Sequence, residues 1–376
     1  MDTAPLIFRT PAALWRNQPV VHSGKFTRVI FGMGAAALLL NEVVRTGAHR
    51  VLVIGTAGRR AELERIADSI APRAIGICGE AVMHTPVAVS DRVTVESQKA
   101  RADLLISIGG GSAIGLGKAV SLRSGLPHIA LPTTYSGSEL TPILGQTEAG
   151  VKRTTRDDTL RPVTIIYDPS LSLGVPALIA AASGMNAMAH AVEALYMTNH
   201  AIVAEVASAA IQHLRAALPL IAASPRDELE RGRALYGAWL AGFCLAETPM
   251  ALHHKLCHTL GGAFDLPHAQ AHAVLLPHSL AYNAPAIGPA YASLKMFFGD
   301  LASDPAEALF WLVEKLGLPK SLGALGLPEE GIDRVARLAC QDAYANPRPL
   351  EQAAIGRLLS RAWAGALPTS EVVLHA

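Results

Sequence analysis

Short apolar and β-branched runs alternate with helix-like segments between about residues 25 and 170, and this rhythm constrains the fold more than any other feature. Five runs have the length and composition of buried strands. They cover residues 50–55, 74–78, 103–108, 128–131 and 163–167. The segments between them show helical spacing over residues 60–70, 87–100 and 112–122. This alternation predicts a mostly parallel sheet with helices on both faces.

The strand signal fades after Pro176, where long segments rich in alanine and leucine take over. Residues 179–197, 202–218 and 228–245 have helical periodicity, which predicts an all-helical second half. A chain of 376 residues exceeds what one hydrophobic core usually organises, so two domains are expected. Asp-Pro and Gly-Val-Pro punctuate residues 168–176. We therefore predict an α/β domain over residues 1–171 and a helical domain over residues 172–376.

Charge and cysteine usage argue against several classes of protein. The 32 Lys and Arg residues nearly balance the 31 Asp and Glu residues, and they form no basic stripe that could follow a nucleic-acid backbone. The four cysteines are scattered without a CxxC pair, so neither a zinc ribbon nor a disulfide framework is indicated. Residues 1–8 lack a secretion signal, and apolar stretches such as residues 35–40 are too short to span a bilayer. We expect a cytoplasmic protein without nucleic-acid or membrane partners.

A glycine-rich turn marks a candidate dinucleotide site. Gly109, Gly110, Gly111 and Ser112 follow a predicted strand and open a predicted helix, and residues 115 and 117 are glycines as well. Glycine lets the backbone approach a pyrophosphate closely, and the N–H groups and dipole of a helix start favour an anion. Such a turn can also be a plain tight connection, but its place at the carboxyl end of a strand favours a dinucleotide-binding α/β domain.

The choice between NADH and NADPH stays open. The predicted strand at residues 51–54 ends at Gly55 and Thr56, where many NAD-selective proteins carry an acid that binds the adenosine ribose. That acid is missing, and Arg59 and Arg60 follow nearby. Two arginines at the start of an exposed helix are more often simply solvated, but NADPH remains a candidate cofactor.

Histidines are concentrated in the helical half. Asn186 and His190 are four residues apart, as are His254 and His258, so each pair lies on one face of its helix. A single histidine on an apolar helix is usually a core residue. Five histidines within residues 253–272, however, are hard to explain by packing, and they indicate a site. These five are His253, His254, His258, His268 and His272.

Several longer strings resemble the iron-containing alcohol dehydrogenase superfamily. They are the GGGS turn, LPTTYSGSE at residues 131–139, GMNAMAHAVEALY at 184–196 and the histidine run. Within that superfamily, TPILGQTEAGVKRT at residues 141–154 and LHHKLCHTLGG at 252–262 resemble the maleylacetate reductases. The resemblance implies a dehydroquinate synthase-like fold, with an N-terminal dinucleotide-binding domain, a helical C-terminal domain and an active site in the cleft between them.

The resemblance also bears on metal binding. Metal-dependent members of the superfamily hold a divalent ion with one Asp and three His. Asn186 occupies the Asp position here, while His190, His254 and His268 occupy the His positions and His258 is the adjacent non-ligand histidine. An amide oxygen removes the one anionic ligand and weakens the pull on a cation, although three imidazoles still bind zinc in some proteins. The resemblance therefore implies catalysis without a metal.

The implied activity is reduction of the carbon–carbon double bond of maleylacetate by NADH or NADPH, which gives 3-oxoadipate in the degradation of aromatic compounds. A homodimer acting on this small dicarboxylate is expected. The predicted catalytic residues are His254, His258, His190, His268 and Asn186. The predicted cofactor contacts are Gly109, Gly110, Gly111, Ser112, Thr133, Thr134, Thr56 and Ser136. The predicted substrate contacts are Lys255, Tyr135, Lys152, Arg153 and His253.

Two other functions stay open at this point. A metal-dependent alcohol or lactaldehyde-type dehydrogenase on the same scaffold would reduce a carbonyl group in place of an alkene. A nucleotide-sensing or metal-buffering protein would use the same loop and histidines without turnover.

Overall fold

The computed structural model describes residues 20–23, 27–148, 151–198, 200–341 and 343–370. Contacts within the chain define two compact units. The first comprises the described residues up to Val175 together with Arg226–Leu235, and the second comprises Pro176–Pro225 and the described residues from Tyr236 onward. The predicted domain boundary after residue 171 stays a prediction.

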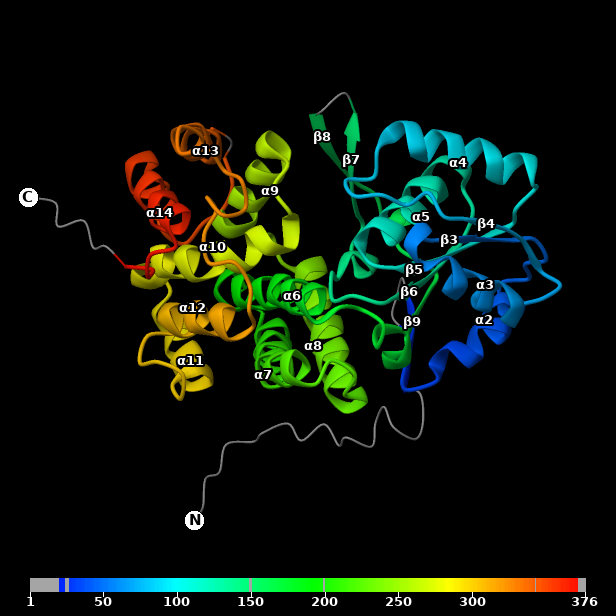
Figure 1. The fold of residues 1–376 in the computed structure, drawn as a ribbon, viewed down its shortest axis with the longest axis horizontal. Helices are drawn as coiled ribbons and strands as arrows, with labels where there is room; N and C mark the ends of the chain where they lie inside the picture. The colour runs from blue at the N-terminus through cyan, green and yellow to red at the C-terminus, as the bar shows by residue number, and fades with distance from the viewer. Residues whose placement is uncertain (1–19, 24–26, 149–150, 199, 342, 371–376) are drawn as a thin grey trace, which may run out of the picture. The chain divides into compact units, whose positions relative to one another are not determined.

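The first unit is built on a seven-stranded sheet whose strands are hydrogen-bonded in the order β1-β2-β9-β6-β5-β3-β4 (Figure 1). The strands are β1 (Val20–Ser23), β2 (Arg28–Phe31), β3 (Val51–Ile54), β4 (Ala74–Cys78), β5 (Leu104–Gly109), β6 (His128–Pro132) and β9 (Thr164–Tyr167). All neighbouring pairs are parallel except β1 and β2. The predicted mostly parallel sheet is confirmed, because fully buried apolar runs form its inner strands.

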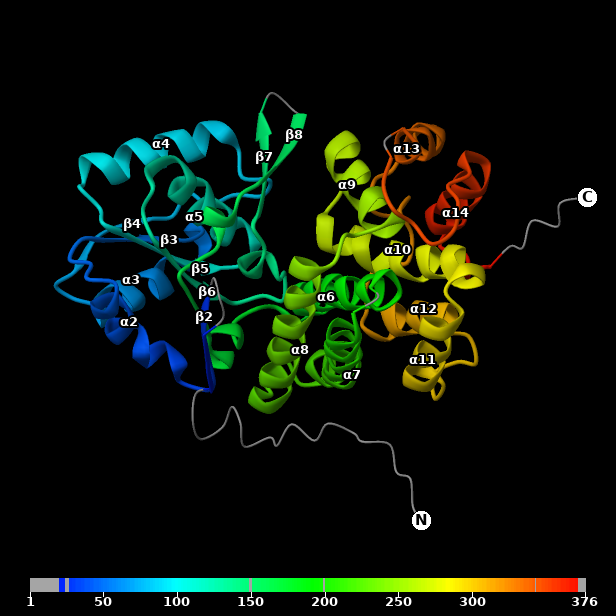
Figure 2. The same cartoon turned by 180° about the vertical axis from the view of Figure 1, so that it is seen from behind.

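Helices cover both faces of this sheet, as both ribbon views show (Figures 1 and 2). They are α2 (Leu39–Arg45), α3 (Arg60–Ser69), α4 (Val87–Lys99) and α5 (Gly111–Ser124). Alternate residues of β3 serve the two faces: Val51 and Val53 pack with residues of α2 and α3, whereas Leu52 and Ile54 pack with residues of α4 and α5. This alternation follows from the two-residue period of a strand.

An antiparallel hairpin, formed by β7 (Ile143–Glu148) and β8 (Val151–Arg156), adds a second small sheet to the first unit. The sequence analysis predicted no strands here. Gln146, Glu148 and Arg153 leave the two strands without an apolar run, and strand prediction depends on such runs.

The second unit is helical throughout its described residues, as predicted. Its helices are α6 (Ala177–Met197), α7 (Ala201–Ala223), α9 (Leu252–Phe264), α10 (His268–Asn283), α11 (Gly288–Phe298), α12 (Pro305–Lys315), α13 (Gly331–Ala339) and α14 (Gln352–Ala364). Helix α8 (Glu228–Glu247) begins in the first unit and ends in the second. Residues of α9, α10, α13 and α14 share one large core cluster that includes Leu256, Leu275, Val335 and Ile355.

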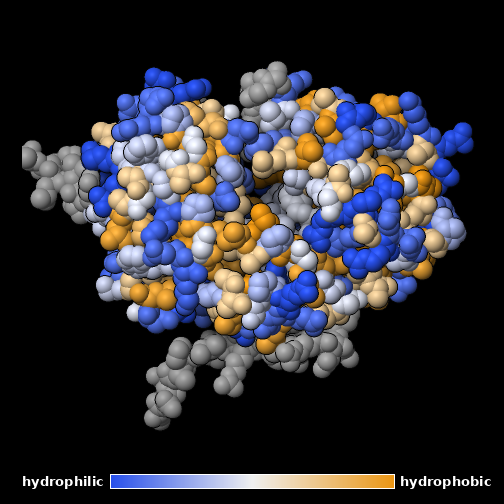
Figure 3. Space-filling view, viewed as in Figure 1, coloured by the Kyte–Doolittle hydropathy of each residue, from blue (hydrophilic) through white to orange (hydrophobic). Residues whose placement is uncertain are grey.

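Helix α7 alone among the described helices is long and apolar enough to cross a membrane by length and composition. Its buried residues, however, form one stripe with helical spacing, as in an amphipathic helix that packs one face against its neighbours. They are Val203, Ala207, Ala210, Ile211, Leu214, Ala217, Leu218 and Ile221. Hydrophobic and hydrophilic side chains are interspersed on the face of the molecule in Figure 3.

Candidate active site

The glycine turn in the first unit has the geometry of an anion site. Strand β5 ends at Gly109, whose φ of 142° is accessible mainly to glycine, and α5 begins at Gly111. Gly110 precedes the helix and provides no side-chain cap, so a ligand can meet the N–H groups of the first turn. The geometry is consistent with the predicted pyrophosphate contact by Gly109, Gly110, Gly111 and Ser112.

The two later glycines have a different role from the one the sequence suggested. A Cβ atom at Gly115 would lie 2.5 Å from the hydroxyl oxygen of Thr85, and one at Gly117 would lie 2.5 Å from Nε2 of His128. Both glycines therefore make room for side chains that pack against α5. The interpretation that they let the backbone approach a phosphate was wrong for these two positions, because the space beside them is filled by the protein.

The segment that follows β6 lies beside the glycine turn. A Cβ atom at Gly110 would approach the Thr134 side chain to 3.0 Å, and one at Gly111 would approach that of Ser136 to 3.8 Å. The backbone N–H of Thr133 donates to the carbonyl of Gly109 over 2.9 Å. Three predicted cofactor contacts, Thr133, Thr134 and Ser136, are thus gathered at the start of α5.

Lys118 forms hydrogen bonds to the C-terminal part of this segment. The sequence analysis did not identify this lysine. Its ammonium group is fully buried and donates to the carbonyls of Ser138 and Ile143, each over 2.7 Å, and to the hydroxyl of Thr141 over 3.2 Å. Burial lowers the pKa of Lys118 to about 7. The helical spacing from Gly111 to Lys118 could have signalled an inward-facing side chain.

Thr56 and Arg59 lie at the end of β3, at the edge where the sheet is expected to bind the adenosine half of the cofactor. Arg59 is already engaged: it donates to the hydroxyl of Thr133 over 2.9 Å, to Glu62 over 2.8 Å and to the carbonyl of Leu171 over 3.1 Å. A 2′-phosphate would have to compete with these partners for the guanidinium.

Tyr135, a predicted substrate contact, is buried inside the first unit. Burial raises the pKa of Tyr135 to about 12, and the nearby positive charge of Arg231 offsets part of that rise. Of the other two predicted substrate contacts in this unit, Lys152 pairs with Thr147 in the β-hairpin and Arg153 is exposed beside Gln146.

Six histidines come together in the second unit, on three helices. Helix α6 contributes His190, helix α9 contributes His253, His254 and His258, and helix α10 contributes His268 and His272. The rings of His190 and His254 stack with centroids 5.0 Å apart, and those of His258 and His268 stack at 5.9 Å. The rings of His254 and His258 are 6.2 Å apart. The four predicted catalytic histidines therefore form one continuous cluster.

Exposure changes steadily through this histidine cluster. His258 is exposed, His268 is partly buried, His254 and His190 are about 95% buried or more, and His272 and His253 are completely buried. Burial, followed by repulsion from the neighbouring imidazoles, holds the pKa of His190, His253 and His272 well below the usual value. The inner rings are therefore neutral near pH 7, and the outer rings meet solvent.

Glu193 fixes the orientation of His254, and sequence reasoning missed it. Its fully buried carboxylate accepts a short hydrogen bond from Nδ1 of His254, and also accepts the backbone N–H of His253 over 3.0 Å. The remaining nitrogen of His254, Nε2, is buried and has no hydrogen-bond partner among the described residues. Glu193 lies three residues after His190 and seven after Asn186, so helical periodicity alone would have placed it on the site face of α6.

The residues that match the metal ligands of the family suit a divalent cation. The amide oxygen of Asn186 and Nδ1 of His190 are, like Nε2 of His254, buried without a hydrogen-bond donor in the described structure. A carboxylate behind a ligand histidine, as Glu193 is behind His254, is a common arrangement at zinc sites. The donor set fits a metal that accepts three imidazoles, although it lacks an anionic ligand.

The other two predicted substrate contacts of this unit lie on α9. Lys255 is partly buried, and its ammonium lies 5.8 Å from the centre of the Tyr344 ring. His253 has both ring nitrogens in hydrogen bonds inside the protein, to Ser279 and to His272. That position favours a supporting role for His253 over direct contact with substrate.

Comparison with known proteins agrees with both halves of this description. A model of the iron-containing alcohol dehydrogenases matches residues 27–169, and a model of the C-terminal part of the Fe-containing alcohol dehydrogenase family matches residues 180–363. The maleylacetate reductase of Burkholderia cepacia is 46% identical to this chain, over 92% of the chain and 98% of that relative.

Solved structures give the same result. The crystal structure of maleylacetate reductase from Agrobacterium tumefaciens has a TM-score of 0.87 and 45% identity, and covers 93% of this chain and 100% of that one. The maleylacetate reductase structure from Rhizobium sp. strain MTP-10005 has a TM-score of 0.86 and 44% identity, over 94% of this chain and all of that one. The chain belongs to the iron-containing alcohol dehydrogenase family, in the group of the maleylacetate reductases.

Proposed function

We propose that this oxidoreductase uses NADH or NADPH to reduce the carbon–carbon double bond of maleylacetate, giving 3-oxoadipate. The observation that carries the proposal is the cluster of His190, His254, His258 and His268, in a chain that is 46% identical to the maleylacetate reductase of Burkholderia cepacia. A degradative role for aromatic compounds, a cytoplasmic location and a homodimer belong to the same proposal.

The reaction makes three demands. A hydride from the dihydronicotinamide forms a bond to the alkene carbon β to the ketone, and the π electrons move to the ketone oxygen as an enolate. That oxygen must be stabilised, and a proton must then reach the carbon next to the ketone. The oxidised nicotinamide is then released.

The cofactor would be held by the first unit. The N–H groups that open α5 at Gly111 and Ser112 would bind the pyrophosphate, and Thr133, Thr134 and Ser136 would contact the nucleotide beside them. Thr56, at the end of β3, would lie near the adenosine end. Lys118 stabilises this arrangement because its ammonium group donates to backbone carbonyls of the segment that follows Ser136.

The histidines would meet the substrate. Nδ1–H of His254 donates a hydrogen bond to Glu193, so Nε2 is the nitrogen that can face the ketone oxygen and donate to it when it carries a proton. His258 is the exposed histidine of the cluster, and the ring of His268 stacks on it. These two residues are therefore suited to pass a proton from solvent to the donor. Asn186 and His190 complete the histidine-lined side of the substrate site. Lys255, Lys152 and Arg153 are candidates to pair with the two carboxylates of the substrate.

A metal is not needed in this proposal. If one were bound, His190, His254 and His268 would hold it, and it would supply a Lewis acid for the ketone oxygen. Asn186 in place of a carboxylate lowers the affinity for such an ion. The competing function, a metal-dependent dehydrogenase acting on a carbonyl, requires that ion.

Consumption of NADH and NADPH with maleylacetate, beside a panel of aldehydes and ketones and with and without a chelator, tests the proposal. We expect oxidation of the cofactor with maleylacetate that persists after chelation. Chelator-sensitive reduction of aldehydes, with stoichiometric iron or zinc in the purified protein, would instead establish the carbonyl dehydrogenase.

Replacement of His254 tests the role of the cluster. His254→Ala is expected to lower kcat by about 100-fold or more, as for the loss of a general acid, while the Kd for NADH changes less than about twofold. His200→Ala, at an exposed histidine before α7, is the matched control. Unchanged turnover in His254→Ala would remove this residue from the mechanism.

A further inference from the structure

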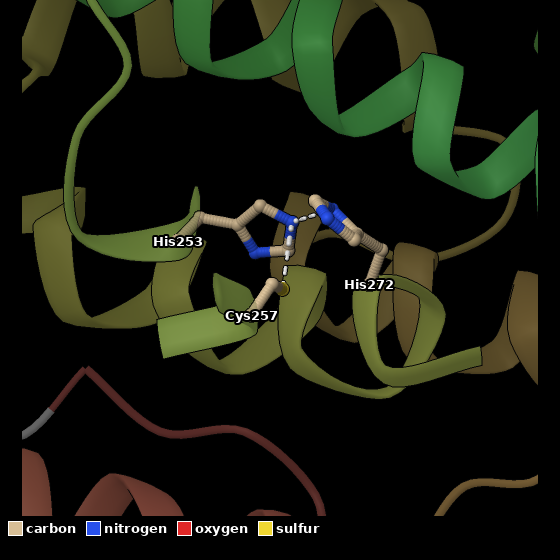
Figure 4. Close-up of side chains that lie close together, drawn as sticks. All are labelled: His253, Cys257 and His272. Carbon is tan, nitrogen blue, oxygen red and sulfur yellow. Dashed lines mark hydrogen bonds between the residues drawn. The ribbon is translucent and has the colours of Figure 1, made fainter. Parts of the chain in front are cut away.

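Behind the four proposed catalytic histidines, the two innermost rings of the cluster take part in hydrogen bonds that the proposed reaction does not use; Figure 4 shows His253, His272 and Cys257. His272 Nδ1 lies 2.9 Å from His253 Nε2, and His253 Nδ1 lies 2.9 Å from the hydroxyl of Ser279. The thiol of Cys257 also approaches His253 Nε2, at 3.7 Å. All four side chains are completely buried, so water cannot substitute for any of these partners.

The hydroxyl of Ser279 determines which nitrogen of His253 carries hydrogen. Its oxygen lies within hydrogen-bond distance of the carbonyls of Leu275, at 3.0 Å, and Leu276, at 3.2 Å, one turn back along α10, and we assign its single hydrogen to these acceptors. The oxygen is then an acceptor for His253, and Nδ1 of His253 must be the donor. The ring is completely buried and neither of its hydrogen-bond partners, Ser279 and His272, is a carboxylate, so it stays neutral. Its Nε2 therefore carries only a lone pair.

The same reasoning passes on to His272. A lone pair on His253 Nε2 requires a donor opposite it, so Nδ1 of His272 carries the hydrogen. The Cys257 thiol is a second, weaker donor to the same lone pair, which agrees with this assignment. His272 is completely buried as well and its hydrogen-bond partner is an imidazole, so it also stays neutral. Its Nε2 is thus left as a lone pair, buried and without a hydrogen-bond partner among the described residues.

We propose that His272 is a positioning residue of the active site and that Ser279, acting through His253, fixes the tautomer in which His272 presents Nε2 as a hydrogen-bond acceptor to the cluster. Beyond its bond to His253, the ring of His272 packs edge-on against His268, with centroids 4.4 Å apart, and against His254, at 4.9 Å. The tautomer rests on the hydrogen bonds alone, whereas its catalytic consequence rests on the proposed function.

An acceptor at this place orients the imidazole beside it. The nearest ring, that of His268, is the one that leads from the inner rings toward His258 and solvent. A lone pair on His272 favours orientations of His268 that turn an N–H toward it and disfavours those that turn a lone pair toward it. The opposite tautomer of His272 would reverse that preference and misalign the ring.

The same side chains have the composition of a metal site. The ligand atoms of His253, Cys257 and His272 all lie within 4.8 Å of one another. An ion bound there would need the lone pairs of His253 Nε2 and His272 Nδ1 together, and the bond between these two nitrogens excludes that unless it breaks. A metal at this place is therefore the outcome that would contradict the proposed tautomer.

Nitrogen NMR of the full-length protein labelled with ¹⁵N-histidine tests the assignment without reference to turnover. The spectra of His272→Asn and His253→Asn assign the two rings. We expect a protonated Nδ1 and an unprotonated Nε2 for both residues in the wild type. A protonated Nε2 on His272, or one zinc per chain that is lost in Cys257→Ala, would overturn the proposal.

Two variants then link the tautomer to catalysis. Ser279→Ala removes the acceptor for His253, so the population of His272 with a protonated Nε2 should rise and kcat should fall about tenfold, with the KM for NADH unchanged. His272→Asn keeps a donor for His253 but withdraws the acceptor from the cluster, so it should lower kcat similarly. Equilibrium unfolding of the variant checks that the assayed protein is folded.

Ser208→Ala, which removes a comparable serine-to-backbone bond in α7, is the control and should leave kcat and both tautomers unchanged. Wild-type kcat with both variants would refute the positioning role even if the tautomers are as assigned. If maleylacetate is not reduced at all by the wild type, the proposed function fails, while the NMR result on the tautomers still stands or falls separately.

Discussion

Replacing Glu193 with glutamine changes one oxygen for an NH₂ group at the most constrained point of the histidine cluster. The carboxylate now accepts from three donors: Nδ1 of His254, the backbone N–H of His253, and the hydroxyl of Tyr196 at 3.3 Å. Glutamine keeps only one acceptor oxygen. If that oxygen serves His254, the NH₂ group faces the N–H of His253, donor against donor. If it serves the backbone, the NH₂ group faces His254 and forces Nδ1 to become an acceptor.

Either outcome has a calculable cost. A hydrogen bond to a charged group contributes about 1.5–3 kcal/mol, and a buried donor left without an acceptor costs about 1–3 kcal/mol. In the second outcome the neutral His254 carries its hydrogen on Nε2 and can no longer be recharged while it remains hydrogen-bonded to its partner. With a factor of ten in rate for each 1.4 kcal/mol, kcat should fall about 10- to 100-fold.

Steady-state kinetics with maleylacetate and NADH, beside equilibrium unfolding of both proteins, measures the two costs separately. Glu193→Gln should lower kcat with little change in the KM for NADH, because the predicted cofactor contacts lie in the first unit. Glu247→Gln, at an exposed position at the end of α8, is the control. A kcat within twofold of wild type, at unchanged stability, would refute the role of Glu193.

Three other changes test separate parts of the structure. Gly117→Ala should destabilise the protein by about 1–3 kcal/mol through overpacking against His128, whereas Gly58→Ala, with open space around it, should not, and equal unfolding free energies would refute this. Lys118→Met leaves the carbonyls of Ser138 and Ile143 without their donor and should raise the KM for NADH about fivefold or more. An unchanged KM would show that the segment after β6 keeps its conformation without this lysine. Burial, aided by Arg361, lowers the pKa of His278 from 6.5 to about 4, so the unfolded chain binds a proton at a higher pH than the folded protein does. The free energy of unfolding should therefore fall by about 2 kcal/mol from pH 7 to pH 5 because of this residue. In urea unfolding, His278→Asn should show a pH dependence that is smaller by this amount.

The inner sheet could be predicted from the sequence because parallel strands buried on both faces are continuous apolar runs. The segments at residues 51–54, 104–109 and 164–167 all have this property. The β-hairpin does not, since β8 reads Val-Lys-Arg-Thr-Thr-Arg and its described side chains are exposed. Pairing between two polar strands depends on the turn and on their neighbours, which a search for apolar runs does not detect.

The high frequency of histidine in one stretch of sequence identified the cluster, but it could not assign roles to the individual histidines. Five histidines in twenty residues pointed to a site, and the helical repeat correctly placed pairs such as Asn186 and His190 on one face. What the repeat cannot show is which buried acid or hydroxyl meets each ring. Glu193 and Ser279 each lie far in sequence from the histidine they contact, so only the packing of α6, α9 and α10 reveals them.

The imidazole rings of the cluster differ in the group that accepts a hydrogen bond from Nδ1. Nδ1 of His254 donates to a carboxylate and Nδ1 of His272 donates to another imidazole, so both rings leave Nε2 without a partner in the described structure but differ in the group that lies behind them. Beside a carboxylate, an imidazole is stabilised when it gains a proton, whereas a fully buried neutral ring is not. His254, which has a carboxylate behind it, is therefore better suited than His272 to donate to the enolate oxygen. Reduction of an alkene next to a ketone needs this distinction, because the enolate oxygen must meet one donor while the rings around it stay neutral.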